Sequence, residues 1–191
     1  MRQMSFAALS TPRLALRPFT VADVDEAHAL WTDPALRRDL WGDVVLGRAA
    51  AADVLRASAA DFSGRGFGLW RLHDRASGAL IGFCGCRTAG GPEPELVYGL
   101  RPAWWGQGLA VEAATAVLDL VFFTLLHTDV VAATDPPNRA SIRVMEKLGL
   151  SWARRGTLNG LDTVFYRLAR ATWRRHRGLA VCSRPRGTAH A

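Results

Sequence analysis

Trp105-Gly106-Gln107-Gly108-Leu109-Ala110 joins a strand-like run, Glu95 to Leu100, to a helix-like run, Leu109 to Leu126. A glycine turn at such a junction gathers main-chain N–H groups at the positive end of a helix dipole, where they bind phosphate or pyrophosphate. Gly106 and Gly108 also permit positive φ and a close approach of the main chain to a ligand. Because two-glycine turns are common at helix starts that bind nothing, the rest of the chain has to decide between an anion site and a plain turn.

Composition predicts one globular domain followed by a basic tail. The chain has 191 residues, 49% of them hydrophobic, and a net charge of +7. We expect the domain to span residues 1–173 and the tail, residues 174–191, to be solvated and disordered, because it holds five arginines and no acid. Without the tail, 19 basic and 17 acidic residues remain, so a basic nucleic-acid surface is disfavoured. Binding of nucleic acid through the tail is the minor alternative.

Neither a membrane span nor a metal site is expected. The longest apolar run, residues 117–126, is interrupted by Asp119, and the N-terminus lacks a secretory hydrophobic segment, so we expect a cytoplasmic protein. Cys84 and Cys86 are two apart in a strand-like run and share a face, which favours buried free thiols. The third cysteine is Cys182, and no second Cys/His pair stands at ligand spacing.

The remaining patterns alternate strands and helices around the glycine turn. Strand-like alternation or apolar runs predict strands at residues 13–19, 67–73, 79–87, 95–100, 129–134, 151–157 and 164–169. Helical spacing predicts helices at residues 20–31, 48–62, 109–126 and 138–148. Asn138 is a natural N-cap, Gly149 a terminator, and Asn159-Gly160 a tight hairpin turn.

Two blocks of sequence make this order specific. Residues 98–113 resemble the acetyl-CoA pyrophosphate loop of the GNAT acetyltransferase superfamily, and residues 138–150 resemble its Asn-x-x-Ser…Glu-Lys-Leu-Gly-Phe helix. With Thr11-Pro12-Arg13-Leu14-Ala15-Leu16-Arg17, they resemble the RimJ/RimL-like branch of ribosomal-protein-alanine N-acetyltransferases. The resemblance covers about residues 11–170 and implies a mixed α/β fold. We therefore expect a mostly antiparallel sheet of six to seven strands with a splayed parallel pair, flanked by about four helices.

The resemblance implies a binding site for acetyl-CoA as co-substrate. The main chain of Trp105, Gly106, Gln107, Gly108, Leu109 and Ala110 would hold the pyrophosphate, although Trp105 stands where the family usually has Arg or Gln. Asn138 would bind the pantetheine arm or serve only as a helix cap. Ser141 and the main chain of Val97 and Tyr98 complete the expected cofactor contacts.

The same resemblance suggests the catalytic groups. Glu95 is the candidate base that deprotonates the amine, directly or through a water, with Glu93 a weaker alternative. Main-chain N–H groups near Val97 and Tyr98 would stabilise the oxyanion if the strand bulges there. Where many relatives carry a tyrosine that protonates the leaving thiolate, this chain has Met145, and Ser141 is the nearest hydroxyl.

The acceptor is the least specified part of the site. Trp31 and Trp41 are candidate substrate contacts, and the alternative for each is a place in the hydrophobic core. Asp39 and Asp43 could attract a cationic amine. We expect acetyl transfer to a primary amine, on a protein N-terminus or a small molecule, by direct attack in a ternary complex. The alternative is a non-catalytic acetyl-CoA-binding regulator. Relatives occur as monomers and dimers, so a homodimer stays open.

Overall fold

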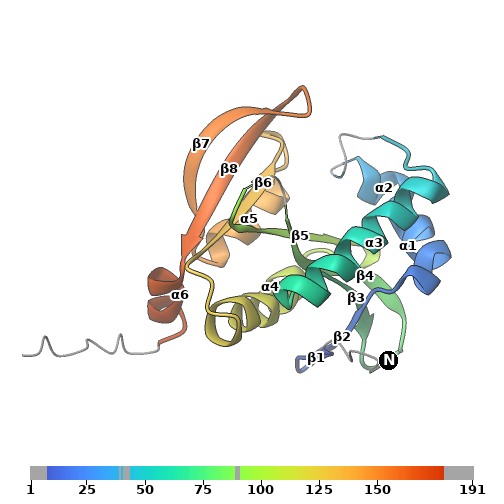
Figure 1. Ribbon diagram of the computed structural model, residues 1–191, viewed down its shortest axis with the longest axis horizontal. Helices are drawn as coiled ribbons and strands as arrows, with labels where there is room; N and C mark the ends of the chain where they lie inside the picture. The colour runs from blue at the N-terminus through green and yellow to red at the C-terminus, as the bar shows by residue number, and fades with distance from the viewer. Residues whose placement is uncertain (1–7, 39, 41–43, 89–90, 179–191) are drawn as a thin grey trace, which may run out of the picture.

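The computed structural model of the chain describes residues 8–38, 40, 44–88 and 91–178 (Figure 1). The strands are β1 (Leu9–Ser10), β2 (Leu14–Pro18), β3 (Leu69–Asp74), β4 (Leu80–Thr88), β5 (Pro94–Leu100), β6 (Asp129–Thr134), β7 (Ser151–Leu158) and β8 (Leu161–Ala169). The α-helices are α1 (Val24–Trp31), α2 (Pro34–Arg37), α3 (Arg48–Arg65), α4 (Leu109–Asp119), α5 (Arg139–Lys147) and α6 (Arg170–His176). Two 3-10 turns, η1 (Val21–Asp23) and η3 (Pro102–Trp104), and a π-helical turn, η4 (Leu120–Thr124), complete the elements.

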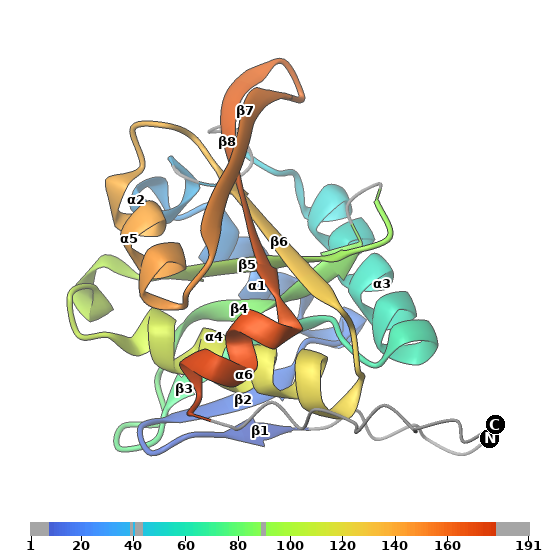
Figure 2. The same cartoon turned by 90° about the vertical axis from the view of Figure 1, so that its left-hand side faces the viewer.

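One sheet runs through the molecule in the order β1-β2-β3-β4-β5-β6-β8-β7. Every neighbouring pair is antiparallel except β5 and β6, which are parallel and register only at Glu95 and Val131. The β4–β5 register is continuous from Gly82–Leu100 to Thr88–Pro94, so β5 does not bulge on that side. The open feature is instead the divergence of β6 from β5, seen in Figure 2. The predicted fold class, a mostly antiparallel sheet with a splayed parallel pair, is confirmed.

Local chemistry explains where the elements near this opening begin and end. The side chain of Asn138 caps α5 by accepting a hydrogen bond from the main-chain N–H of Ser141 at 3.0 Å. Gly149, with φ +83°, follows the end of that helix. Asn159 and Gly160 both have positive φ and form the tight turn between β7 and β8. The predicted cap, terminator and hairpin turn are all present.

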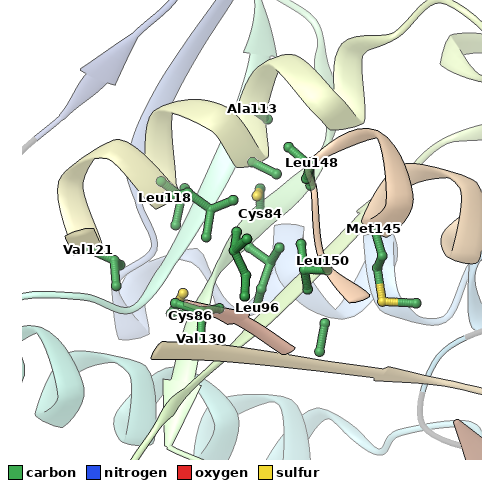
Figure 3. Close-up of a cluster of buried hydrophobic side chains, with 14 of the residues drawn as sticks. Cys84, Cys86, Leu96, Ala113, Leu118, Val121, Val130, Met145, Leu148 and Leu150 are labelled. Carbon is green, nitrogen blue, oxygen red and sulfur yellow. The ribbon is translucent and has the colours of Figure 1, made fainter. Parts of the chain in front are cut away.

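Two apolar clusters cover the two faces of the sheet. The larger joins β2–β6 to α4, α5 and α6, and part of it is drawn in Figure 3. The smaller packs α1, α2 and α3 against Phe19, Leu69 and Phe83. Cys84 and Cys86 are free thiols buried in the larger cluster, as expected, and burial raises the pKa of both.

Helix α6 includes the first residues of the segment expected to be a disordered tail. Trp173 is fully buried, its indole N–H donates to Asp119 at 2.9 Å, and its ring lies 6.3 Å from that of Phe122. These contacts with α4 and η4 hold residues 170–176 in a helix, so the expected boundary at residue 173 falls inside an element. Residues 179–191 lie outside the described part of the chain. No described helix combines the length and the apolar composition that crossing a membrane requires.

Candidate active site

The glycine turn forms the N-terminus of α4. Gly106 and Gly108 have φ of +73° and +76°, and Gly108 is the N-cap. A Cβ at Gly106 would meet nothing within 4 Å, so glycine is favoured here by the backbone angle and not by lack of space. The first bond of the helix runs from the N–H of Glu112 to the carbonyl of Gly108. The preceding N–H groups of Leu109, Ala110 and Val111 therefore have no acceptor within the helix.

A partly exposed hydrogen-bond network fixes this turn to the segment between β1 and β2. The carboxylate of Glu112 accepts from the Thr11 hydroxyl at 2.5 Å and from the main-chain N–H and guanidinium of Arg13 at 2.9 and 2.6 Å. Arg13 also donates to the carbonyl of Gln107 at 3.0 Å. Burial alone would raise the pKa of Glu112, but the hydrogen bonds from Thr11 and Arg13 outweigh it and lower that pKa.

A cavity of about 530 Å³ opens in front of the turn. Its lining includes Trp105, Gly106, Gly108, Leu109 and Ala110, so five of the six predicted loop residues contribute to it. Gln107 does not, because its side-chain amide donates back to the carbonyl of Ala103. The described lining carries four cations and no carboxylate; the cations are Arg38, Arg139, Arg143 and Lys147. Free helix N–H groups opposite a basic wall favour an anionic ligand.

A second cavity, of about 560 Å³, lies across the divergence of β5 and β6. Glu95, Val97 and Met145 line it, together with residues of β6 and the β7–β8 hairpin. Glu95 is only 5% exposed, and its carboxylate accepts from the guanidinium of Arg87 at 2.7 Å. Glu93, the weaker candidate, does not line this cavity and pairs with Arg167 at 3.3 Å.

The two cavities meet at four residues: Leu40, Tyr98, Asn138 and Ser141. The Tyr98 hydroxyl donates to the main-chain carbonyl of Ser141 at 3.0 Å and also lies 3.0 Å from its Oγ. Burial raises the pKa of Tyr98, so the phenol stays protonated at neutral pH. Two hydroxyls therefore lie where the anion site meets the second cavity, and the carboxylate of Glu95 lines that second cavity.

One of the two predicted substrate contacts, Trp31, is in the core, and the other is not described. Trp31 is fully buried between Phe19 and Phe83, with ring centroids 5.8 and 6.0 Å away, and lines neither cavity. Its expected place at the acceptor site is corrected to a core position, because α1 turns that face toward the sheet. Trp41 lies outside the described residues, as do Asp39 and Asp43. Within the described ranges, no three His, Cys, Asp or Glu side chains gather as metal ligands.

Two functional groups of the second cavity escaped the sequence patterns. The side chain of Tyr98, expected to contribute only its main chain, contacts Ser141 on another element. Arg87, in β4 directly opposite Glu95 in β5, pairs with the candidate base. Opposite charges at facing positions of two adjacent strands were the available signal.

Comparison with known proteins identifies the fold family. The chain is 36% identical over 94 residues to the uncharacterized protein YkkB of Bacillus subtilis, a match covering 48% of this chain and 55% of that relative. It is 26% identical over 163 residues to the uncharacterized N-acetyltransferase p20 of Bacillus licheniformis, covering 84% and 90% of the two chains. The chain thus spans about half the length of the first relative and most of the second.

Solved structures share the whole fold. An acetyltransferase from Agrobacterium tumefaciens superimposes with a TM-score of 0.75 at 28% identity, covering 86% of this chain and 95% of that one. RimL, a ribosomal-protein acetyltransferase solved in complex with coenzyme A, superimposes with a TM-score of 0.71 at 16% identity, covering 85% and 98%. Residues 13–151 match the family model described as an acetyltransferase (GNAT) domain. The match takes in both the glycine turn and α5, and the chain belongs to the GNAT acetyltransferase family.

Proposed function

We propose that this protein is an acetyl-CoA-dependent N-acetyltransferase that acts on a primary amine. The observation that carries the proposal is the meeting of two cavities at Tyr98, Asn138 and Ser141. One cavity has a basic wall and free helix N–H groups, and the other holds a buried carboxylate. This arrangement suits a donor and an acceptor that enter from different sides and react directly in a ternary complex.

The first cavity fits coenzyme A on chemical grounds. The N–H groups of Leu109, Ala110 and Val111 suit a diphosphate, and the basic residues of α5 suit further negative charge. Asn138 uses its side-chain oxygen to cap α5, which leaves its amide N–H groups to donate to a pantetheine amide. Acetyl-CoA supplies the acetyl group as a thioester, an activated acyl donor.

The second cavity supplies the base. Glu95 takes a proton from the incoming ammonium, directly or through a water, because only the neutral amine has a lone pair with which to attack. Arg87 holds the carboxylate in place through its 2.7 Å ion pair. Val97 and Tyr98 follow the last residue of β5 in register with β6. Because β5 pairs regularly with β4 there, only one of their two main-chain N–H groups points to the opening, and we assign that group to the oxyanion.

The hydroxyl pair supplies the returning proton. As the new C–N bond forms, the C–S bond breaks and a thiolate leaves, with a conjugate thiol pKa of about 8.5. The Ser141 hydroxyl lies at the junction and protonates this thiolate. The Tyr98 hydroxyl, 3.0 Å from Ser141 Oγ, orients that hydroxyl. The nitrogen loses a second proton as the amide forms, and this proton balances the one gained by sulfur. The first proton, taken by Glu95, passes to solvent.

A direct assay tests the function. Purified protein is incubated with acetyl-CoA and a panel of protein N-terminal peptides and small amines, and CoA release and product mass are measured. We expect acetylated amine, with turnover lowered about 10²-fold or more in Glu95→Gln. Glu93→Gln is the matched control and should keep full turnover. Tight acetyl-CoA binding without turnover would instead support the non-catalytic regulator.

A further inference from the structure

The charges of the second cavity limit what kind of amine it suits. Its described lining contains three charged residues, Arg87, Glu95 and Asp135. Both carboxylates already have interaction partners, which for Glu95 is the guanidinium of Arg87, so the lining holds little unbalanced negative charge. A polyamine or an aminoglycoside carries several ammonium groups, each of which loses hydration unless a carboxylate receives it. This lining matches one ammonium group far better than several.

The mouth of the cavity is apolar on both sides. Leu158 and Leu161 face each other across the turn of the β7–β8 hairpin and are 38% and 43% exposed. Val44, in the connection between α2 and α3, lines the cavity and is 59% exposed. Large aliphatic side chains exposed around a cavity are typical of a ligand-binding rim.

We propose that the acceptor is a primary amine attached to an apolar body, such as an alkyl or arylalkyl chain or a hydrophobic N-terminal residue. This inference rests on the proposed function and specifies its substrate class. The nitrogen reaches Glu95 at the inner end of the cavity, while the apolar body contacts Val44, Leu158 and Leu161 at the mouth. Binding removes these side chains and the ligand's own carbon chain from water.

A homologous series of amines tests the inference. The probes are straight-chain amines from propylamine to heptylamine, phenethylamine, spermidine, an aminoglycoside, and tripeptides beginning with Ala, Leu or Asp. We expect kcat/KM to rise about fourfold for each methylene that becomes buried. The kcat/KM values of spermidine and the aminoglycoside should be at least tenfold lower than that of heptylamine. If the Leu tripeptide has a higher kcat/KM than heptylamine, the acceptor is a protein N-terminus. If heptylamine has the higher kcat/KM, the acceptor is a small molecule.

Two adjacent valines provide a matched pair of variants. Val44 and Val45 are both 59% exposed, but only Val44 lines the cavity. Val44→Asn and Leu161→Asn should flatten the dependence of kcat/KM on chain length, whereas Val45→Asn should keep the dependence of the unmodified protein. If kcat/KM in the unmodified protein does not depend on chain length, or if spermidine is the best acceptor, the proposal of an apolar acceptor is wrong. The proposed acetyltransferase function would still hold. Acetylation of no probe overturns both.

Discussion

At the scale of single residues, the hydroxyl of Tyr98 can be removed without changing the shape of the core. Tyr98→Phe removes the two 3.0 Å contacts with Ser141. We expect kcat to fall about fivefold to tenfold, the value of one hydrogen bond, with an unchanged KM for acetyl-CoA. Ser141→Ala should lower kcat further, by about 10²-fold. If Tyr98 acts through Ser141, the double variant matches Ser141→Ala; additive losses would show two independent roles.

The backbone of Gly108 provides a second residue-scale prediction. Because Gly108 has φ +76° at the N-cap of α4, a side chain there is strained whatever space surrounds it. We expect Gly108→Ala to lower the free energy of unfolding by about 1–2 kcal/mol and to weaken CoA binding, measured by denaturant titration and calorimetry. Gly47, the N-cap of α3, has φ −68° and open space, so Gly47→Ala is the control and should change stability little. An equal effect of both substitutions would remove the role assigned to the left-handed turn.

The sequence predicted main-chain chemistry at the site better than side-chain contacts. The glycine turn and the cap at Asn138 depend on residues within a few positions of each other, so local patterns were enough. The contact of Tyr98 with Ser141 joins residues 43 positions apart on β5 and α5, and no local pattern encodes it. Trp31 was misplaced for the same reason, because amphipathic spacing in α1 does not say which face meets the sheet.

At the scale of elements, the carboxylate of Glu112 fixes the start of α4 to the segment between β1 and β2. Its pKa lies below the ordinary value of 4.5, so the folded state binds fewer protons than the unfolded state in acid. The stabilisation is therefore complete above about pH 4.5 and is lost as the pH falls through the lowered pKa. We expect Glu112→Gln to lower the free energy of unfolding at pH 7 by about 1–2 kcal/mol.

The pH dependence separates this network from general acid unfolding. The stability difference between the unmodified protein and Glu112→Gln should shrink when urea titrations are repeated at pH 5, 4 and 3. Glu146, exposed on α5, gives a control, because Glu146→Gln should show no such dependence. A difference that stays constant down to pH 3 would contradict the network as the cause.

The order of elements was largely predictable, and the exceptions share one physical cause. Strand β6 and helix α5 fall where the apolar run and the Asn-to-Gly spacing placed them. Helix α2 has four residues and β1 two, too few for a period to emerge. Helix α6 depends on Trp173 reaching Asp119 and Phe122, contacts that form only in the folded chain. Short elements held by distant partners leave little trace in sequence.

At the scale of the whole molecule, the position of positive charge matters more than its sum. The net charge of +7 suggested a basic tail on a nearly neutral body. Among the described residues, the structure places four cations and no carboxylate around one cavity of that body. Regions of one sign inside a concave surface concentrate the field and attract an oppositely charged ligand. Coenzyme A carries that charge on its phosphates, so its binding should depend on this cavity and on salt.

A ligand that binds only the folded state stabilises the whole molecule. CoA at 100 times its Kd should raise the free energy of unfolding by about 2.7 kcal/mol, which corresponds to a Tm increase of about 5–10 °C for a chain of this size. The increase should shrink as salt rises from 50 to 500 mM. Arg143→Gln, on the cavity wall, should weaken CoA binding about threefold at low salt and reduce the salt dependence. Arg56→Gln removes the same charge on α3, away from that cavity. This control should change neither the affinity for CoA nor its salt dependence. A Tm that does not respond to CoA would exclude the glycine turn and its basic wall as a coenzyme site.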